Sequence, residues 1–193
     1  MKKIIIVAVF ILGSLVSQAQ EGQVWHTNID EAISVSKKEN KPLFLFFTGS
    51  DWCGWCIRLQ KEVFKTPEFT AWAKDNVVLV ELDFPRKNMQ TDEIKKQNME
   101  LQQFFAVQGY PTVWFTKAGI DPSGKTSFEK LGSQGYMTGG PTVWITSASL
   151  ITSKFVKYTK EEVKGAKSNK KSIEKAMKKT VKAAKKATVD AVK

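Results

Sequence analysis

Both cysteines of the chain directly follow an apolar run. The run PLFLFFTG spans Pro42 to Gly49, and the string SDWCGWC that follows it, residues 50–56, holds Cys53 and Cys56. A continuous apolar run of this length is typical of a strand that is covered on both faces. After Cys56, apolar side chains recur at helical spacing, as at Leu59 and Val63. The sequence therefore predicts a buried strand, a short loop and a helix, with Cys53 near the start of that helix.

Helical and extended patterns alternate along the chain between residues 29 and 152. Helices are predicted over residues 29–40, 91–105 and 141–152. Two more are predicted between the first two of these, one that follows Cys56 and one that begins at Pro67. Strands are predicted over residues 42–49, 77–84, 112–120 and 126–132. Strands that alternate with helices and end in a hairpin indicate an α/β fold, with a mixed central sheet and helices on both faces.

Three interpretations of the cysteine pair compete. A structural zinc site needs four ligands, but the chain offers two cysteines and one histidine, His26. We therefore expect no metal site, and a surface or packing role for His26. A structural disulfide that closes so short a loop would remove little entropy from the unfolded chain. Redox chemistry is the third interpretation, and it fits Cys53 near a helix N-terminus, where backbone N–H groups and the helix dipole stabilise a thiolate.

These residues carry a family resemblance. The string FTGSDWCGWCIRLQKEVF, together with GYPT at residues 109–112, resembles the thioredoxin superfamily. It is most similar to secreted thioredoxin-like proteins of Gram-negative bacteria that are related to the C-terminal domain of the transmembrane disulfide reductase. The resemblance covers about residues 24–152 and implies a thioredoxin fold for this domain. The motifs are specific together, although a lone C-x-x-C would be weak.

The resemblance also implies roles for individual residues. Cys53 is the attacking thiol and Cys56 the resolving thiol, so the pair itself is the redox-active disulfide and no other cofactor is expected. Pro111 matches the cis-proline of the family, and a cis bond there turns the backbone of Tyr110 toward the substrate. The implied substrate-binding residues are Trp52, Trp55, Tyr110 and Pro111. For the two tryptophans, plain packing in the core is the alternative.

The chain departs from the family pattern near the cysteines. Phe47 stands six residues before Cys53, where thioredoxins carry a buried aspartate that helps to deprotonate the resolving thiol. Glu62 is either a substitute for that acid or an ordinary surface glutamate. Ile57 stands where the family has a lysine after the second cysteine. The redox potential and the direction of electron flow therefore cannot be copied from thioredoxin.

The beginning of the chain has the order of a secretory signal peptide. Lys2 and Lys3 precede an apolar run from Ile4 to Leu12, and a small residue follows at Ala19. We expect cleavage after Ala19, which makes residues 1–19 the signal peptide and the mature chain periplasmic or secreted. The alternative is a membrane anchor, but the apolar run is shorter than the ~20 residues that span a bilayer.

Charge is distributed unevenly. From Glu21 to Ser153 there are 14 Lys and Arg against 15 Asp and Glu, whereas from Lys154 to Lys193 there are 14 Lys against 4 acidic residues. The high pI therefore describes a basic tail, residues 153–193, and no nucleic-acid binding is expected of the domain. The tail is either a basic helix with a weakly apolar stripe or a partly disordered extension. Contact with an anionic surface is its functional interpretation.

The sequence thus favours a thiol-disulfide oxidoreductase that acts on protein disulfides outside the cytoplasm and serves redox homeostasis there. Family analogy favours a reductase or isomerase over an oxidase. The expected partners are proteins with disulfides or thiols, and an upstream redox partner that restores the cysteine pair. The alternative is a thioredoxin-fold module that binds peptides and undergoes no redox turnover.

Overall fold

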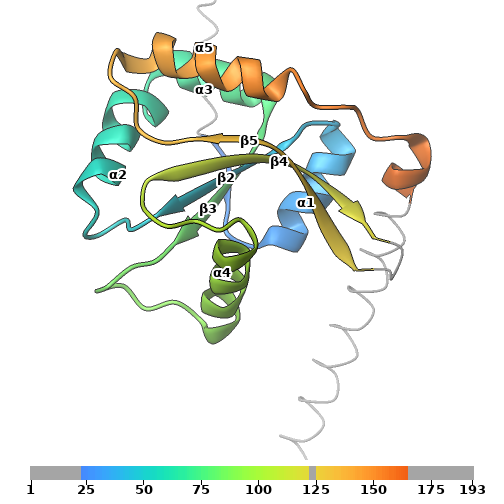
Figure 1. Ribbon diagram of the computed structural model, residues 1–193, viewed down its shortest axis with the longest axis horizontal. Coiled ribbons are helices and arrows are strands. Elements are labelled where there is room, and N and C mark those ends of the chain that lie inside the picture. Colours follow the sequence, from blue (N-terminus) through green and yellow to red (C-terminus); the bar gives the residue numbers. More distant parts are fainter. Residues whose placement is uncertain (1–22, 122–124, 165–193) are drawn as a thin grey trace, which may run out of the picture.

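A five-stranded mixed sheet forms the centre of the molecule (Figure 1). The computed structural model describes residues 23–121 and 125–164, so the predicted signal peptide and most of the predicted tail lie outside the described residues. In the order of their pairing, the strands are β1 (Trp25–His26), β3 (Val78–Asp83), β2 (Leu43–Thr48), β4 (Thr112–Ile120) and β5 (Thr126–Gln134). β2 pairs with β3 in parallel and with β4 antiparallel, which makes the sheet mixed.

Helices cover both faces of this sheet. They are α1 (Ile29–Glu39), α2 (Gly54–Leu59), α3 (Pro67–Asn76), α4 (Asp92–Phe104) and α5 (Gly140–Thr152). α1 and α4 bury residues such as Ala32 and Leu101 in one core cluster, and α2, α3 and α5 contribute to the other. In Figure 1, α3 and α5 lie above the sheet and α4 lies below it. Within the described residues, no helix combines the length and the apolar character needed to cross a membrane.

The predicted α/β fold, with a mixed sheet between helices, is confirmed. The strand predicted over residues 112–120 has these bounds in the structure, and the strand predicted over 126–132 continues to Gln134. The pairing of β4 with β5 shifts register between Phe115 and Thr116, and such a bulge leaves no mark in the hydrophobic pattern. β1 was not predicted, because its two residues are too short to show any periodicity.

Aromatic rings fill the face of the sheet that α2, α3 and α5 cover. Phe44 on β2 is fully buried and lies at the centre of this packing. Its ring centroid is 5.3 to 5.9 Å from the rings of Trp25, Phe64, Phe69, Phe115 and Trp144. The same core cluster contains Cys53 and Cys56. The start of α2, where the two cysteines lie, therefore packs against a cluster of buried aromatic side chains.

The chain remains packed on the domain after α5, although the sequence predicts that the tail begins at residue 153. Tyr158 is buried, and its hydroxyl lies 2.9 Å from Ser36 Oγ and accepts the N–H of Ala118 (3.1 Å). Glu162 forms an ion pair with Lys117 on β4 (3.2 Å). One buried tyrosine in a lysine-rich segment is too weak a signal for sequence patterns to mark this extension of the domain.

Candidate active site

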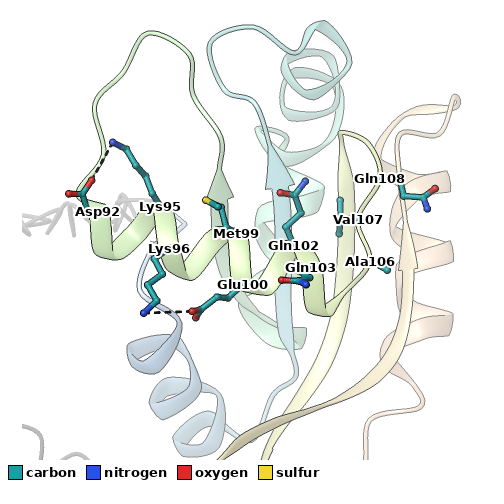
Figure 2. Close-up of a pocket in the computed structure, with 10 residues that line it drawn as sticks. All are labelled: Asp92, Lys95, Lys96, Met99, Glu100, Gln102, Gln103, Ala106, Val107 and Gln108. Atoms are coloured by element: carbon teal, nitrogen blue, oxygen red, sulfur yellow. Dashed lines mark ion pairs between the residues drawn. The ribbon is translucent and has the colours of Figure 1, made fainter.

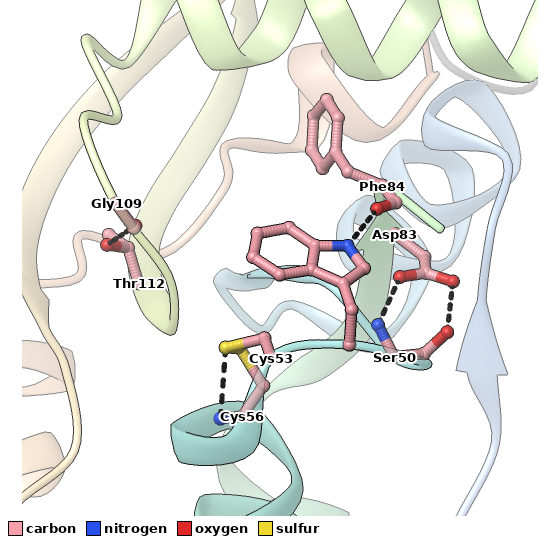
Figure 3. Close-up of a disulfide and its surroundings, with 8 residues drawn as sticks. Ser50, Cys53, Cys56, Asp83, Phe84, Gly109 and Thr112 are labelled. Atoms are coloured by element: carbon pink, nitrogen blue, oxygen red, sulfur yellow. Dashed lines mark hydrogen bonds between the residues drawn. A yellow bond between two sulfur atoms is a disulfide. The ribbon is translucent and has the colours of Figure 1, made fainter. Parts of the chain in front are cut away.

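The two cysteines lie where β2 passes into α2. Cys53 caps the N-terminus of α2, and its N–H donates to the carbonyl of Gly49 (2.9 Å). Cys53 and Cys56 form a disulfide and expose 7% and 0% of their surface (Figure 3). The N–H of Cys56 donates to Cys53 Sγ (3.2 Å). In the reduced pair, this donor and the helix N-terminus would stabilise a thiolate at Cys53.

α2 continues into a turn of π-helix, Gln60–Phe64. Such turns are rare and are found frequently at functional sites. Here the turn buries both Val63 and Phe64 in the core and leaves Glu62 near the surface. The sequence predicts an uninterrupted α-helix here. A π-turn bonds residue i to i+5 instead of i+4, and this difference of one residue is too small to show in the spacing of the apolar side chains.

The loop before β4 lies beside the cysteine pair. The peptide bond between Tyr110 and Pro111 is cis, as the resemblance implies. Tyr110 packs against the core cluster that contains both cysteines. Figure 3 shows Gly109 and Thr112, which flank these two residues, on one side of the disulfide, and the hydroxyl of Thr112 donates to the carbonyl of Gly109 (2.8 Å).

Trp52, the residue before Cys53, is fixed by contacts with three other residues. Its indole N–H donates to the carbonyl of Phe84 (2.8 Å), and its ring packs edge-on against Tyr110 with 5.9 Å between centroids. The guanidinium carbon of Arg86 lies 4.0 Å from the centroid of the Trp52 ring. Trp52 is 37% exposed. It is therefore a surface residue held in place by polar and aromatic contacts, rather than a core residue.

Trp55 belongs to a second group of side chains. Its ring packs against Tyr136 (5.1 Å between centroids), and Arg58 lies over both rings at 5.4 and 5.2 Å. The hydroxyl of Tyr136 donates to Glu62 (2.7 Å), which also binds Arg58 (2.8 Å). These hydrogen bonds lower the pKa of Glu62, the one from Tyr136 most strongly. Trp55 is 56% exposed, so it too lies at the surface rather than in the core.

Two carboxylates hold the loop that leads to Cys53. Asp83, at the end of β3, accepts the backbone N–H (2.8 Å) and the hydroxyl (2.6 Å) of Ser50 (Figure 3). The carboxylate of Asp51 accepts backbone N–H groups of the next loop at 2.7 to 3.2 Å, those of Arg86, Lys87 and Asn88. The loop between β3 and α4 and the loop that carries the cysteines are thus tied together.

Comparison with protein families matches this arrangement to a known domain. The profile of the thioredoxin-like domain covers residues 29–139, which is more than half of the chain. The chain belongs to the thioredoxin-like family. The matched residues of this thioredoxin-like chain include Cys53, Cys56 and the cis-proline, so the site described above lies within the shared domain.

Individual relatives support the assignment. The disulfide bond reductase DsbH of Chlamydia pneumoniae is 40% identical over 108 residues, which are 56% of this chain and 65% of DsbH. The thioredoxin-related protein DsbJ of the same organism is 36% identical over 88 residues, 46% of this chain and 25% of DsbJ. The chain thus spans less than two thirds of either relative. A solved structure of DsbH oxidoreductase superposes on this chain with a TM-score of 0.58 at 36% identity. The superposed region covers 68% of this chain and 85% of the DsbH chain.

The acid that thioredoxins bury near the resolving cysteine has no counterpart at the expected positions. Phe47 lies on the face of β2 opposite the cysteines, where its ring packs 6.1 Å from that of Phe105. The carboxylate of Glu62 lies at the surface and binds Arg58 and Tyr136, so it is the ordinary surface glutamate of the two interpretations.

A different acid does lie on the cysteine face of the sheet. Glu81 on β3 pairs in register with Phe46, whose side chain belongs to the same core cluster as the cysteines. Burial raises the pKa of Glu81, and the neighbouring charge of Asp83 raises it further. The sequence of β3 contains both Glu81 and Asp83 and does not show which side chains either acid will meet, so the position of Glu81 could not be predicted from it.

The contacts of Asp51 predict a pH-dependent change at this site. Backbone hydrogen bonds, led by that from Arg86, lower the pKa of Asp51. Because the folded-state pKa is lowered, these bonds are at full strength above the usual aspartate pKa of about 3.9 and are lost as the pH falls through the folded-state value. We expect the amide signals of Arg86, Lys87 and Asn88 in NMR spectra to move together with a midpoint below about 3.9.

The variant Asp51→Asn is the control for this titration, because an amide does not ionise in this range. It should abolish the common shift of the three amide signals. A midpoint at or above the usual aspartate value, or amide signals that stay in place as Asp51 is protonated, would show that the carboxylate does not hold the loop.

Two other features lie away from the cysteines. A hollow of about 690 Å³ runs along α4 and residues 106–108 (Figure 2), on the sheet face opposite α2, and ion pairs such as that of Lys96 with Glu100 (3.9 Å) lie along it. His26 faces Glu31 of α1 at 3.8 Å, also on that side. Within residues 23–121 and 125–164, no three His, Cys, Asp or Glu side chains are grouped so as to hold a metal ion.

Proposed function

We propose that this protein is a thiol-disulfide oxidoreductase that reduces or isomerises protein disulfides through Cys53 and Cys56. The observation that carries the proposal is the position of the pair. Cys53 caps a helix beside a cis-proline loop, and Cys56 is buried one turn later, in a chain that is 40% identical to the disulfide bond reductase DsbH over the shared region. The exposed rings of Trp52 and Trp55 would contact the substrate, together with Tyr110 and Pro111.

In the proposed reaction, two electrons pass from the cysteine pair to the substrate. The thiolate of Cys53 attacks one sulfur of a substrate disulfide, so that the substrate S–S bond breaks and a mixed disulfide forms. The substrate sulfur that leaves takes up a proton. Cys56, as a thiolate, then attacks Cys53 Sγ, which releases the second substrate thiol and closes the disulfide between Cys53 and Cys56.

The pair needs a partner to complete each cycle. After one turnover it is oxidised, so a reducing partner outside the cytoplasm must return two electrons to it. Residues 1–19 would direct the chain to the periplasm or beyond the cell, as a cleaved signal peptide. In this proposal residues 24–152 are the catalytic domain. Of the predicted tail, 153–193, the basic residues beyond the packed Glu162 would add reversible, salt-sensitive contact with an anionic surface, because each lysine near such a surface contributes roughly 1 kcal/mol.

The redox potential of the pair tests the direction of electron flow. We expect a value between about −270 and −180 mV, the interval from thioredoxin to protein disulfide isomerase. The full chain would be equilibrated with mixtures of reduced and oxidised glutathione, and its free thiols would be alkylated and counted by mass spectrometry. A potential near −120 mV, as in a strong oxidant, would contradict the proposed direction.

A further inference from the structure

The guanidinium of Arg86 stands over the ring of Trp52, the residue that precedes Cys53 in the sequence. Its carbon lies 4.0 Å from the centroid of the Trp52 ring. Among the residues that the structure describes, it takes part in no ion pair, and no side-chain acceptor binds it. A guanidinium carries five N–H donors, and stacking on a ring leaves the donors at its edge available.

Both the backbone and the side chain of Arg86 are held in place. The carboxylate of Asp51 accepts the backbone N–H of Arg86 at 3.0 Å and that of Lys87 at 2.7 Å. The indole on which the guanidinium stacks is itself fixed by its hydrogen bond to the carbonyl of Phe84 (2.8 Å). A cation fixed before the substrate arrives loses less conformational entropy on binding than a free surface lysine does.

The other stacked arginine provides a contrast within the same site. Arg58 also lies over aromatic rings, those of Trp55 and Tyr136, but Glu62 binds its Nε at 2.8 Å and neutralises it. Of the two tryptophans beside Cys53, Trp55 thus lies under a guanidinium that is paired with a carboxylate, whereas the guanidinium over Trp52 has no ion pair within residues 23–121 and 125–164. Of these two arginines, Arg86 is the one whose guanidinium can bind a carboxylate without first breaking an ion pair.

The acidic residues near Arg86 do not replace a substrate anion. The carboxylate of Asp51 is engaged by backbone N–H groups, and that of Asp83 by the N–H and hydroxyl of Ser50. Lys87, the next residue, is exposed and adds a second positive charge to the same loop. Both carboxylates keep their charge, but their oxygens are occupied by these donors, so the N–H groups at the edge of the Arg86 guanidinium remain free to bind an anionic group of a substrate.

We propose that Arg86 selects substrates that carry an acidic side chain beside the reacting disulfide. The aspartate or glutamate of the polypeptide would bind the edge of the guanidinium while the substrate sulfur meets Cys53. This inference rests on the proposed function, since it names the class of protein disulfide that the site prefers. The interaction is present in the encounter complex and in the transition state alike, so it acts on KM more than on kcat.

Three peptides with one intramolecular disulfide test the inference. They differ only in the residue next to one cysteine, which is Glu, Gln or Lys, and the reduced full chain is mixed with each of them. We expect kcat/KM to be about two- to fivefold higher for the Glu peptide than for the Gln peptide at low ionic strength, and lowest for the Lys peptide. The preference should shrink as added salt shortens the screening length.

Variants assign the preference to a residue. Arg86→Gln should make the Glu and Gln peptides equal substrates, and Arg86→Lys should retain part of the preference because it keeps the charge but not the planar fork. Lys125→Gln, which removes an equal charge from the distant end of the β4–β5 hairpin, should leave the preference as in the unchanged chain. The pKa of the Cys53 thiol, followed by the ultraviolet absorbance of the thiolate, is measured in each variant.

The outcomes separate this inference from the proposed function. Equal rates for the Glu and Gln peptides in the unchanged chain, or a preference that persists in Arg86→Gln, would overturn the role of Arg86 while leaving a working reductase. Loss of rate in Arg86→Gln that is equal for all peptides and accompanied by a shifted thiol pKa would also overturn it, because Arg86 would then act on Cys53. If no peptide is reduced by the unchanged chain, the proposed function itself fails.

Discussion

We expect Cys53→Ser to abolish the reduction of protein disulfides, with a loss of at least about a thousandfold, because a hydroxyl at this position cannot serve as the nucleophile in thiol exchange. Cys56→Ser should have a different effect. Cys53 would still attack the substrate, but no second thiol could release it, so the mixed disulfide would persist. The measurement is the rate of insulin reduction with dithiothreitol as electron donor, together with non-reducing gels of the variant and substrate.

The two variants are each other's control, because each removes one sulfur from the same disulfide. A chain that binds peptides without redox turnover would form no mixed disulfide in the Cys56→Ser variant. Such a result would replace the proposed oxidoreductase by a peptide-binding module. Trapping through Cys56 in the Cys53→Ser variant, with none through Cys53, would reverse the roles assigned to the two thiols.

Phe44→Ala should lower the free energy of unfolding by about 3 to 5 kcal/mol, as is usual for removing a buried phenylalanine ring from a packed core. The expected loss is large because Phe44 is fully buried and contacts five other rings. Urea unfolding of the oxidised chain, followed by tryptophan fluorescence, measures the change. The midpoint should fall without a large change in the slope.

Phe104→Ala is the matched control for this prediction. Phe104 lies on α4 and is 48% exposed, although its ring touches those of Phe105 and Phe128. We expect its loss to cost less than half as much as that of Phe44. Similar effects of the two substitutions would show that the aromatic cluster beneath the cysteines does not dominate the stability of the domain.

The sequence predicts most of the fold because its central strands, β2 and β3, are mostly apolar and its helices have regular apolar spacing. The run from Leu43 to Thr48 is buried at every residue, as a strand covered on both faces should be. The elements that patterns missed are local departures from regular structure. β1 has two residues, and the π-turn after α2 changes the helical repeat for a single turn.

The candidate site was predictable where it is continuous in sequence. The cysteines, Trp52 and Trp55 stand in one short string, and the resemblance adds Tyr110 and Pro111; the structure places these residues around one disulfide. Their roles in binding substrate remain predictions. The supporting residues were not predictable, because Ser50 meets Asp83 and Tyr136 meets Glu62 only after the chain has folded. Contacts between residues so far apart in the chain leave no trace in local composition.

Electrostatics was the least predictable part of the site. Phe47 and Glu62 were the positions from which the family pattern would set the acidity of the thiols, and neither places a carboxylate at the cysteines. Instead, the carboxyl of Glu81 comes to the cysteine face through the register of β3 with β2. Strand register depends on the whole sheet, so a sequence pattern cannot assign this neighbour.

The most direct measurement of the central proposal is a single turnover between the reduced chain and one peptide disulfide. The full chain, reduced and freed of reductant, is mixed with excess peptide, quenched with acid, alkylated and analysed by mass spectrometry over time. The account predicts that one disulfide between Cys53 and Cys56 appears for each peptide disulfide reduced, and that a mixed disulfide through Cys53 precedes it. Peptide that stays oxidised while the two cysteines remain as free thiols would contradict the account.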